Sequence, residues 1–313
     1  MEQPPSLIGR KYSNEEKIGI AEVLKEWSKE SGKKVEGELE KTEKDIRMIS
    51  IASSFIEAEL TSLGIDRFEA IKDSNVHFVA SGELGGSESG HYSAVSDSVI
   101  IDTSGADTQS KVLATTVHEL VHRASTQLFH AEEDGGIVEA RVGYRIRSPW
   151  KEPIERQALT GFNEIMVEST VMKILARNAE QIQKEFGISL EDIRGPIYHY
   201  MEYSPVLSRI VAKVAEQKGT SPSEVFNDFE RGQFDSNILV LKDIEKAFGK
   251  GSIEVLSYMG VISDPVARQE IDEKVQQYFE SEDESEKTTL ARTLEGLFGK
   301  ARRGEVEAED KDS

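Results

Sequence analysis

The chain has 313 residues, 31% of them charged and 37% hydrophobic, and its formal net charge of −20 disfavours nucleic acid and anionic membranes as partners. Because cysteine is absent, neither a disulfide nor a thiolate metal site can form, and any metal ion must be held by His, Asp or Glu. No segment has the pattern of a signal peptide or a membrane span, so we expect a cytoplasmic protein without a membrane partner.

The N-terminal part of the chain predicts an irregular arm followed by two helices. Residues 1–13 form the arm, and a helix begins at Asn14 and ends near Gly32. A second helix, predicted over residues 41–63, is apolar enough to belong to the core. We expect residues 1–40 to form an N-terminal arm and helix ahead of the main domain.

Two short strands come next, at residues 76–80 and 99–102, each a β-branched run bounded by turn residues. The segment between them, residues 81–90, is a flexible glycine-rich loop. A phosphate-binding loop runs directly into a helix N-terminus, whereas a strand follows here, which argues against a nucleotide site. In the next turn, residues 103–107, Asp107 is the best candidate for the N-cap of the following helix.

That helix is predicted to run to about Phe129, and it carries the motif His118-Glu119-x-x-His122. Two histidines four residues apart lie one turn above the other, so both imidazoles can reach one metal ion. Glu119 can then take a proton from a water molecule at that ion. His130 follows closely on a predicted loop, and we expect it to be exposed.

The rest of the chain predicts one more strand and then only helices. Residues 137–147 alternate between apolar and charged side chains, which indicates a half-buried strand that we place at a sheet edge. From Gly161 onward no strand is predicted. Residues 281–286 form a charged joint, and the tail after Arg302 is too polar to fold. The predicted helices cover residues 161–179, 188–203, 205–218, 221–230, 236–248, 264–281 and 286–302.

A candidate third ligand lies on the helix predicted at residues 161–179. Glu164 and Glu168 are four residues apart and share one face of an otherwise apolar helix. Two carboxylates on one buried face repel each other unless a positive group lies opposite, and a metal ion held by two histidines is such a group. The alternative is that both glutamates are solvated surface residues. The histidine motif favours the metal-ligand interpretation.

Two motifs together resemble the gluzincins, the thermolysin-like group of zinc metallopeptidases: His118-Glu119-x-x-His122 and Asn163-Glu164-x-x-x-Glu168. The resemblance covers about residues 76–174. It implies that Glu164 is the third zinc ligand and that Glu168 orients His118 through a hydrogen bond. The chain departs from thermolysin in having glutamate rather than aspartate at the orienting position and a longer spacer between the motifs.

The resemblance also implies a reaction, the hydrolysis of a peptide bond by zinc-bound water. Glu119 would accept the proton of this water and deliver it to the leaving amine. The tetrahedral oxyanion needs a further donor, for which Tyr203 is favoured by the resemblance and His199 by its chemistry. The apolar face of its strand makes Tyr144 a better core residue than a donor. The remaining candidates are Tyr198 and Tyr200.

We therefore expect an α+β, zincin-like fold with a small mixed sheet, an active-site helix and a predominantly helical C-terminal half. The catalytic domain would span residues 41–280, with the sheet and active-site helix at 76–147, the ligand helix at 161–179 and a helical subdomain at 186–280. Residues 281–313 would form a charged helix and a disordered acidic tail. The expected cofactor is Zn²⁺, and the expected partner is a peptide or protein substrate. Two alternatives remain open: a zincin-like protein that binds a metal and a partner without proteolysis, and a zinc hydrolase of a non-peptide amide.

Overall fold

The computed structural model is an α+β structure with two sheets in the N-terminal half and a predominantly helical C-terminal half, which confirms the predicted fold class. By its internal contacts the chain divides into two units. Unit 1 comprises residues 1–143, 167–201 and 230–237, and unit 2 comprises residues 144–166, 202–229 and 238–313. The structure describes residues 6–7, 13–31, 35, 37–66, 69–80, 89–103, 109–131, 137–147, 157–194 and 201–302.

Unit 1 contains most of the strands. Its strands are β1 (Ser6–Leu7), β2 (Val76–Val79), β3 (Gly90–Ser93), β4 (Ser98–Asp102), β5 (Gln127–Ala131) and β6 (Ile137–Val142). Its helices are α1 (Asn14–Ser31), α2 (Glu43–Ser62), α3 (Gln109–Ala124), α5 (Ala179–Phe186), α6 (Leu190–Arg194) and the short 3₁₀ helix η1 (Asp73–Asn75). Helix α4 (Thr160–Arg177) crosses from unit 2 into unit 1 after Met166.

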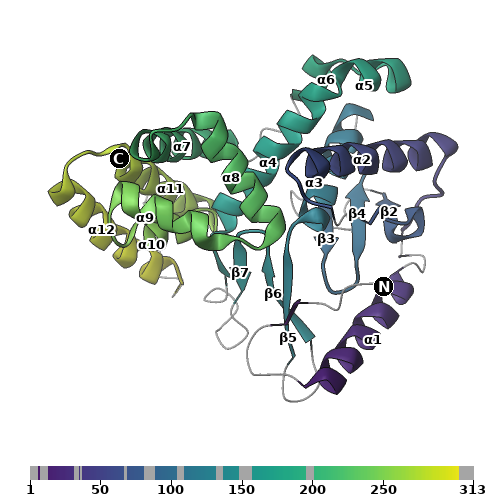
Figure 1. Cartoon of the computed structure of the whole chain (residues 1–313), viewed down its shortest axis with the longest axis horizontal. Helices are drawn as coiled ribbons and strands as arrows, with labels where there is room; N and C mark the ends of the chain where they lie inside the picture. The colour runs from purple at the N-terminus through teal and green to yellow at the C-terminus, as the bar shows by residue number, and fades with distance from the viewer. Residues whose placement is uncertain are drawn as a thin grey trace, which may run out of the picture. The chain divides into compact units, whose positions relative to one another are not determined.

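The three-stranded sheet has the order β2-β4-β3, so β2 and β3 are its two terminal strands. Strand β2 runs parallel to β4, and β3 runs antiparallel to it with Gly90 opposite Ile101. Val99 and Ile101 of β4 are fully buried, as expected for a central strand with apolar residues on its inner face. Helix α3 packs against β3 and β4, and α2 packs against α3 (Figure 1). The helix that carries the histidine motif is therefore supported by a sheet and by a second helix.

The end of α3 differs from the prediction. The helix ends at Ala124 rather than near Phe129, and β5 follows at once, antiparallel to β6. The reason is tertiary: the Thr126 backbone N–H donates to the carbonyl of Gln233, and its hydroxyl donates to the carbonyl of Phe234. These hydrogen bonds take the place of those that a further turn of α3 would form. The expectation of an exposed His130 is also wrong, because His130 lies on β5 and is buried.

The prediction of a single edge strand over residues 137–147 is wrong in two respects. A turn at Gly143 and Tyr144 divides it into β6 and β7 (Arg145–Arg147), and Gly143 adopts a positive φ of 56°. The second sheet has the order β1-β5-β6-β7-β8, with β8 at Gln157–Ala158, so β6 is an interior strand. Its charged side chains therefore do not mark an edge, and buried Arg141 instead donates to the carbonyl of Gly143.

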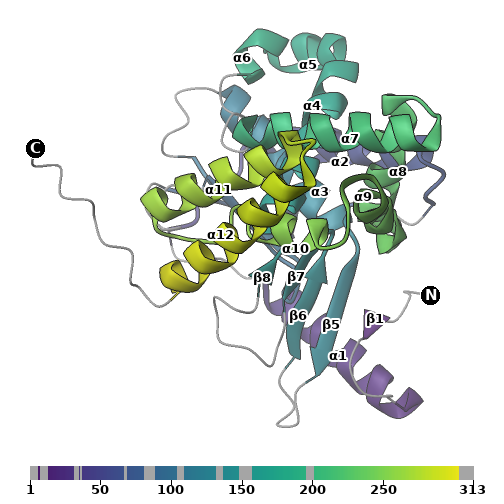
Figure 2. The ribbon, with the colours of Figure 1, turned by 90° about the vertical axis from the view of Figure 1, so that its left-hand side faces the viewer.

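Unit 2 is mainly helical, as predicted, and the described residues after Gly161 contain no strand. Helices α11 and α12 lie side by side, and α7 packs against α9 and α11 (Figure 2). The helical elements after residue 200 are η3 (Met201–Tyr203), α7 (Ser204–Lys218), α8 (Pro222–Asp235), η4 (Ile238–Val240), α9 (Leu241–Phe248), α10 (Ser252–Ser257), α11 (Pro265–Glu280) and α12 (Glu284–Arg302). Helix α8 passes from unit 2 into unit 1 after Phe229, and η3 begins at the last residue of a unit 1 segment. No helix among the described residues combines the length and the apolar character needed to cross a membrane.

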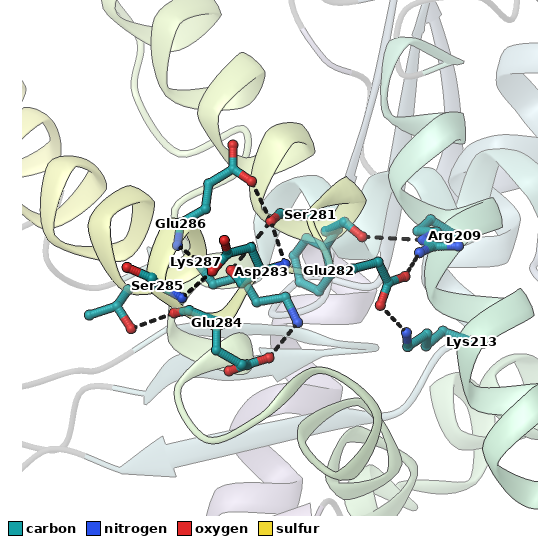
Figure 3. Close-up of polar contacts among 11 residues, drawn as sticks. Arg209, Lys213, Ser281, Glu282, Asp283, Glu284, Ser285, Glu286 and Lys287 are labelled. Carbon is teal, nitrogen blue, oxygen red and sulfur yellow. Dashed lines mark hydrogen bonds and ion pairs between the residues drawn. The ribbon is translucent and has the colours of Figure 1, made fainter.

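The charged joint predicted at residues 281–286 connects α11 to α12 (Figure 3). Asp283 accepts backbone N–H groups from the first turn of α12, so it acts as a helix cap. Glu282 forms ion pairs with Arg209 and Lys213 of α7. The acidic residues of this joint therefore have specific partners in unit 2.

A buried ion-pair network fixes the C-terminal part of α4 within unit 1. Lys173 lies between two carboxylates, Glu59 of α2 and Glu230 of α8, and Arg177 also binds Glu59. Glu230 is fully buried, and this burial raises its pKa. A buried carboxylate is costly unless it is paired, so the position of α4 depends on the Lys173 ammonium group.

Replacing Lys173 with methionine should lower the free energy of unfolding by about 3–5 kcal/mol, because Glu230 loses its cationic partner while it stays buried. Urea unfolding followed by circular dichroism would measure this change. Lys184→Met on α5 is the matched control, since Lys184 is exposed. Equal unfolding free energies for the two variants would contradict the role assigned to Lys173.

Candidate metal centre

The candidate site begins with the two histidines of α3. Leu113, Val117 and Leu120 are fully buried and fix the helix face that points into the core of unit 1. The Nε2 atoms of His118 and His122 approach to 3.1 Å, and their ring centroids lie 4.8 Å apart. The helical repeat therefore brings two nitrogen ligand atoms together, as the motif predicted.

Glu168 of α4 contacts the other side of His118. Its Oε2 atom lies 3.0 Å from His118 Nδ1, and its side chain is buried. A carboxylate that accepts the Nδ1–H proton leaves Nε2 as the free lone pair of the neutral ring. Glu168 therefore holds His118 in the tautomer that a metal ligand needs.

Glu164 lies one helical turn before Glu168 on α4. One carboxylate oxygen of Glu164 and one ring nitrogen each of His118 and His122 lie within 4.8 Å of one another. Tetrahedral coordination with metal–nitrogen distances of about 2.0–2.1 Å separates two nitrogen ligands by roughly 3.3 Å, close to the observed 3.1 Å. The three side chains therefore fit a metal ion held by two imidazoles and one carboxylate.

Asn163, the residue before Glu164, anchors the first turn of α4. It is fully buried, and its Oδ1 atom accepts the backbone N–H of Tyr144 at 2.8 Å. Tyr144 is itself buried and donates its hydroxyl to the carbonyl of Phe229 at 2.6 Å, so it is a core residue, as its strand pattern indicated. The sequence motif included Asn163, but only the tertiary contact shows that its amide oxygen holds the backbone of Tyr144.

The same turn of α4 is also held by two glycines. A Cβ atom at Gly161 would lie 2.8 Å from the carbonyl oxygen of Met259, and one at Gly260 would lie 2.9 Å from Gly161 Cα. The Gly161 N–H donates to the Met259 carbonyl at 3.0 Å. Only glycine at both positions permits this close approach of the α4 N-terminus to the turn after α10. Sequence reasoning did not identify this contact.

Tyr203, the favoured oxyanion donor, lies next to this contact. It is buried, and its hydroxyl donates to Asp272 Oδ2 at 2.8 Å, while Asp272 Oδ1 accepts the N–H of Gly260 at 3.1 Å. Burial and the neighbouring Asp272 carboxylate raise the pKa of Tyr203, so it remains protonated. The structure therefore links Tyr203 to the support of α4. The other candidates, Tyr198, His199 and Tyr200, lie outside the described residues.

Glu119, the candidate proton acceptor, is buried against a terminal strand of the three-stranded sheet. A Cβ atom at Gly90 of β3 would lie 2.9 Å from Glu119 Oε1 and 2.5 Å from Thr115 Cγ2. The absence of a side chain at Gly90 therefore leaves the room that the Glu119 carboxylate occupies. No pattern in the sequence marked Gly90, because the contact joins residues far apart in the chain.

Comparison with known proteins adds nothing to this geometry: no protein-family model, curated protein or solved structure matches the chain. What the structure establishes is a largely buried group of two histidines and one glutamate that could hold a metal ion.

Gly90→Ala should displace the Glu119 carboxylate and lower the free energy of unfolding by about 1–3 kcal/mol, because the new methyl group overlaps Thr115 and Glu119. Gly296→Ala on α12 is the matched control: its Cβ meets open space, and alanine should raise stability by up to about 1 kcal/mol. Chemical unfolding measures both values. Stability of the Gly90 variant equal to wild type would show that β3 does not confine Glu119.

Asp272→Asn should change how stability depends on pH. Burial raises the pKa of Asp272 to about 6, whereas an unfolded aspartate titrates near 3.9. Between these values the folded state binds more protons, so the Asp272 contribution to stability falls as pH rises from about 4 to about 6. Asparagine does not titrate, so the variant should gain stability relative to wild type over this range. Urea unfolding at several pH values tests this, with Glu273→Gln on the exposed side of α11 as control.

Proposed function

We propose that the protein is a zinc-dependent metallopeptidase in which Glu119 acts as the general base. The observation that carries this proposal is the convergence of His118, His122 and Glu164, together with the contact from Glu168 to His118. Two histidines and a glutamate form a ligand set of catalytic zinc sites, in which the fourth position is left for water or substrate. The resemblance of the two motifs to the gluzincins points to the same ion.

The residues of the chain have separate roles in this proposal. A zinc ion at this position would supply Lewis-acid activation of water and of the substrate carbonyl. Glu119 accepts the proton from the attacking water and returns it to the leaving amine. This role requires a carboxylate next to the metal ligands. Glu168 replaces the aspartate of thermolysin, and its longer side chain still reaches His118 Nδ1 at 3.0 Å. This departure from the family pattern therefore preserves the hydrogen bond.

Strand β3, a terminal strand of its sheet, is a candidate for binding an extended peptide. It pairs with β4 on one side, while the interior position of β6 removes the edge first suggested at residues 137–147. A peptide added to a sheet edge gains main-chain hydrogen bonds irrespective of its sequence. Because Gly90 of β3 lies against Glu119, a peptide on this edge would pass close to the general base.

The decisive experiment compares wild type with Glu119→Gln on a peptide library derived from a whole proteome, read by mass spectrometry. Wild type loaded with zinc should cleave a defined subset of peptides. The variant removes only the proton acceptor, so kcat/KM should fall by about 10²–10⁴-fold while bound zinc remains stoichiometric. His122→Ala is the companion variant, because it should lose both zinc and activity.

Three outcomes would contradict the proposal. Full activity of Glu119→Gln would remove the assigned base. Stoichiometric zinc that raises the melting temperature without any hydrolysis would instead indicate a structural or partner-binding metal site. Cleavage of non-peptide amides alone would instead indicate the second alternative, a zinc hydrolase of a non-peptide amide.

A further inference from the structure

Unit 2 contains a cavity of about 270 Å³ remote in sequence from the two motifs. Its buried wall is aromatic and aliphatic but includes one lysine, its rim is charged, and it is about half open to solvent. This volume is just below the range of roughly 300–1,000 Å³ typical of sites for drug-sized ligands, so it suits a smaller molecule. The lining residues that matter here are Phe248, Val255, Tyr258, Tyr278 and Lys287 on the wall and Lys250, Glu254, Glu284, Arg292 and Glu295 on the rim.

Lys287 is the unusual member of the wall. Its side chain is only 6% exposed, whereas a lysine is almost never buried without compensation. Its Nζ atom donates to Glu284 at 2.9 Å (Figure 3). The same atom lies 5.8 Å from the ring centroid of Phe248. The Glu282 carboxylate also interacts with Lys287 electrostatically. Among the described residues Glu284 is the one hydrogen-bond acceptor of the ammonium group, so two of its three N–H donors form no hydrogen bond to the protein. The Glu284 side chain is 78% exposed, so water screens the attraction between its carboxylate and the Lys287 ammonium group.

Other donors and charges in the cavity lack partners too. In the part of the chain that the structure describes, the Tyr278 hydroxyl forms no hydrogen bond, although the residue is buried. Of the three rim carboxylates, Glu254 accepts from Tyr258 and Glu284 accepts from Lys287. The remaining charged groups at the rim are two cations, Lys250 and Arg292, and one carboxylate, Glu295. The three cations of the lining balance its three carboxylates in charge, and the donors on the buried wall are the Lys287 ammonium group and the Tyr278 hydroxyl.

We propose that this cavity is a binding site for a small organic carboxylate with an apolar body, whose carboxylate group is bound by Lys287 and Tyr278. The carboxylate would satisfy the spare donors of the buried ammonium group, a charge-assisted contact stronger than a neutral one. The apolar body would pack against Phe248, Val255 and Tyr258. Free carboxylic acids and amino acids share this chemistry, and Glu295 is placed to accept the ammonium group of the latter. The inference is independent of the metal centre.

Calorimetric titration with three probes that share a phenyl body tests the proposal: 3-phenylpropanoate, phenylalanine and phenethylamine. The two carboxylates should bind, and the amine should not. Tighter binding of phenylalanine than of 3-phenylpropanoate would support an amino acid as the ligand, and the reverse order would support a simple acid. Lys287→Met keeps an unbranched side chain of similar length but removes the donors, so the Kd of the carboxylates should rise about tenfold or more.

Two further variants keep the test decisive if Lys287→Met folds poorly. Tyr278→Phe should weaken carboxylate binding about three- to tenfold, since it removes one hydroxyl donor and no charge. Lys300→Met lies on the same helix outside the cavity and should leave the affinity unchanged. Equal affinity for phenethylamine, unchanged carboxylate affinity in both cavity variants, or no binding up to about 10 mM would overturn the proposal.

Discussion

The hydrogen bond between His118 Nδ1 and Glu168 is the contact on which the candidate metal centre depends. It joins α3 to α4, and it does so through the ring of a ligand residue. Because Glu164 lies one turn from Glu168 on the same helix, the bond that sets the tautomer of His118 also sets the distance of the third ligand. A shift of α4 would therefore disturb two ligand residues together.

The rest of the structure constrains α4 at both ends. At its N-terminal end, Gly161 meets the turn at Met259 and Gly260, and Asn163 holds the backbone of Tyr144. At its C-terminal end, Lys173 pairs with buried carboxylates of unit 1. One end is held by close backbone approach and neutral hydrogen bonds, and the other by paired charges. A helix that presents two buried glutamates needs this support, since their mutual repulsion would otherwise displace it.

Three buried carboxylates of unit 1, those of Glu59, Glu168 and Glu230, have cationic or imidazole partners, whereas the buried Glu119 carboxylate forms no hydrogen bond or ion pair with the described residues. Glu59 is paired with Lys173 and Arg177, and Glu168 with His118. In the cavity of unit 2 the buried charge is instead a cation, Lys287, whose one hydrogen-bonded carboxylate, Glu284, is largely exposed. The two proposed sites are thus complementary, one offering carboxylate and imidazole ligands to a cation and the other offering donors to an anion.

The sequence by itself determined the features that depend on helical periodicity and local composition. The spacing of His118 and His122, the spacing of Glu164 and Glu168, and the α+β class all follow from the 3.6-residue repeat and from short β-branched runs. Tertiary contacts decided the rest. Thr126 leaves the helix for hydrogen bonds to a segment more than a hundred residues away, β6 becomes an interior strand, and the Tyr203 hydroxyl binds Asp272. The local sequence pattern cannot predict these contacts, because the atoms that form them become adjacent only after the chain has folded.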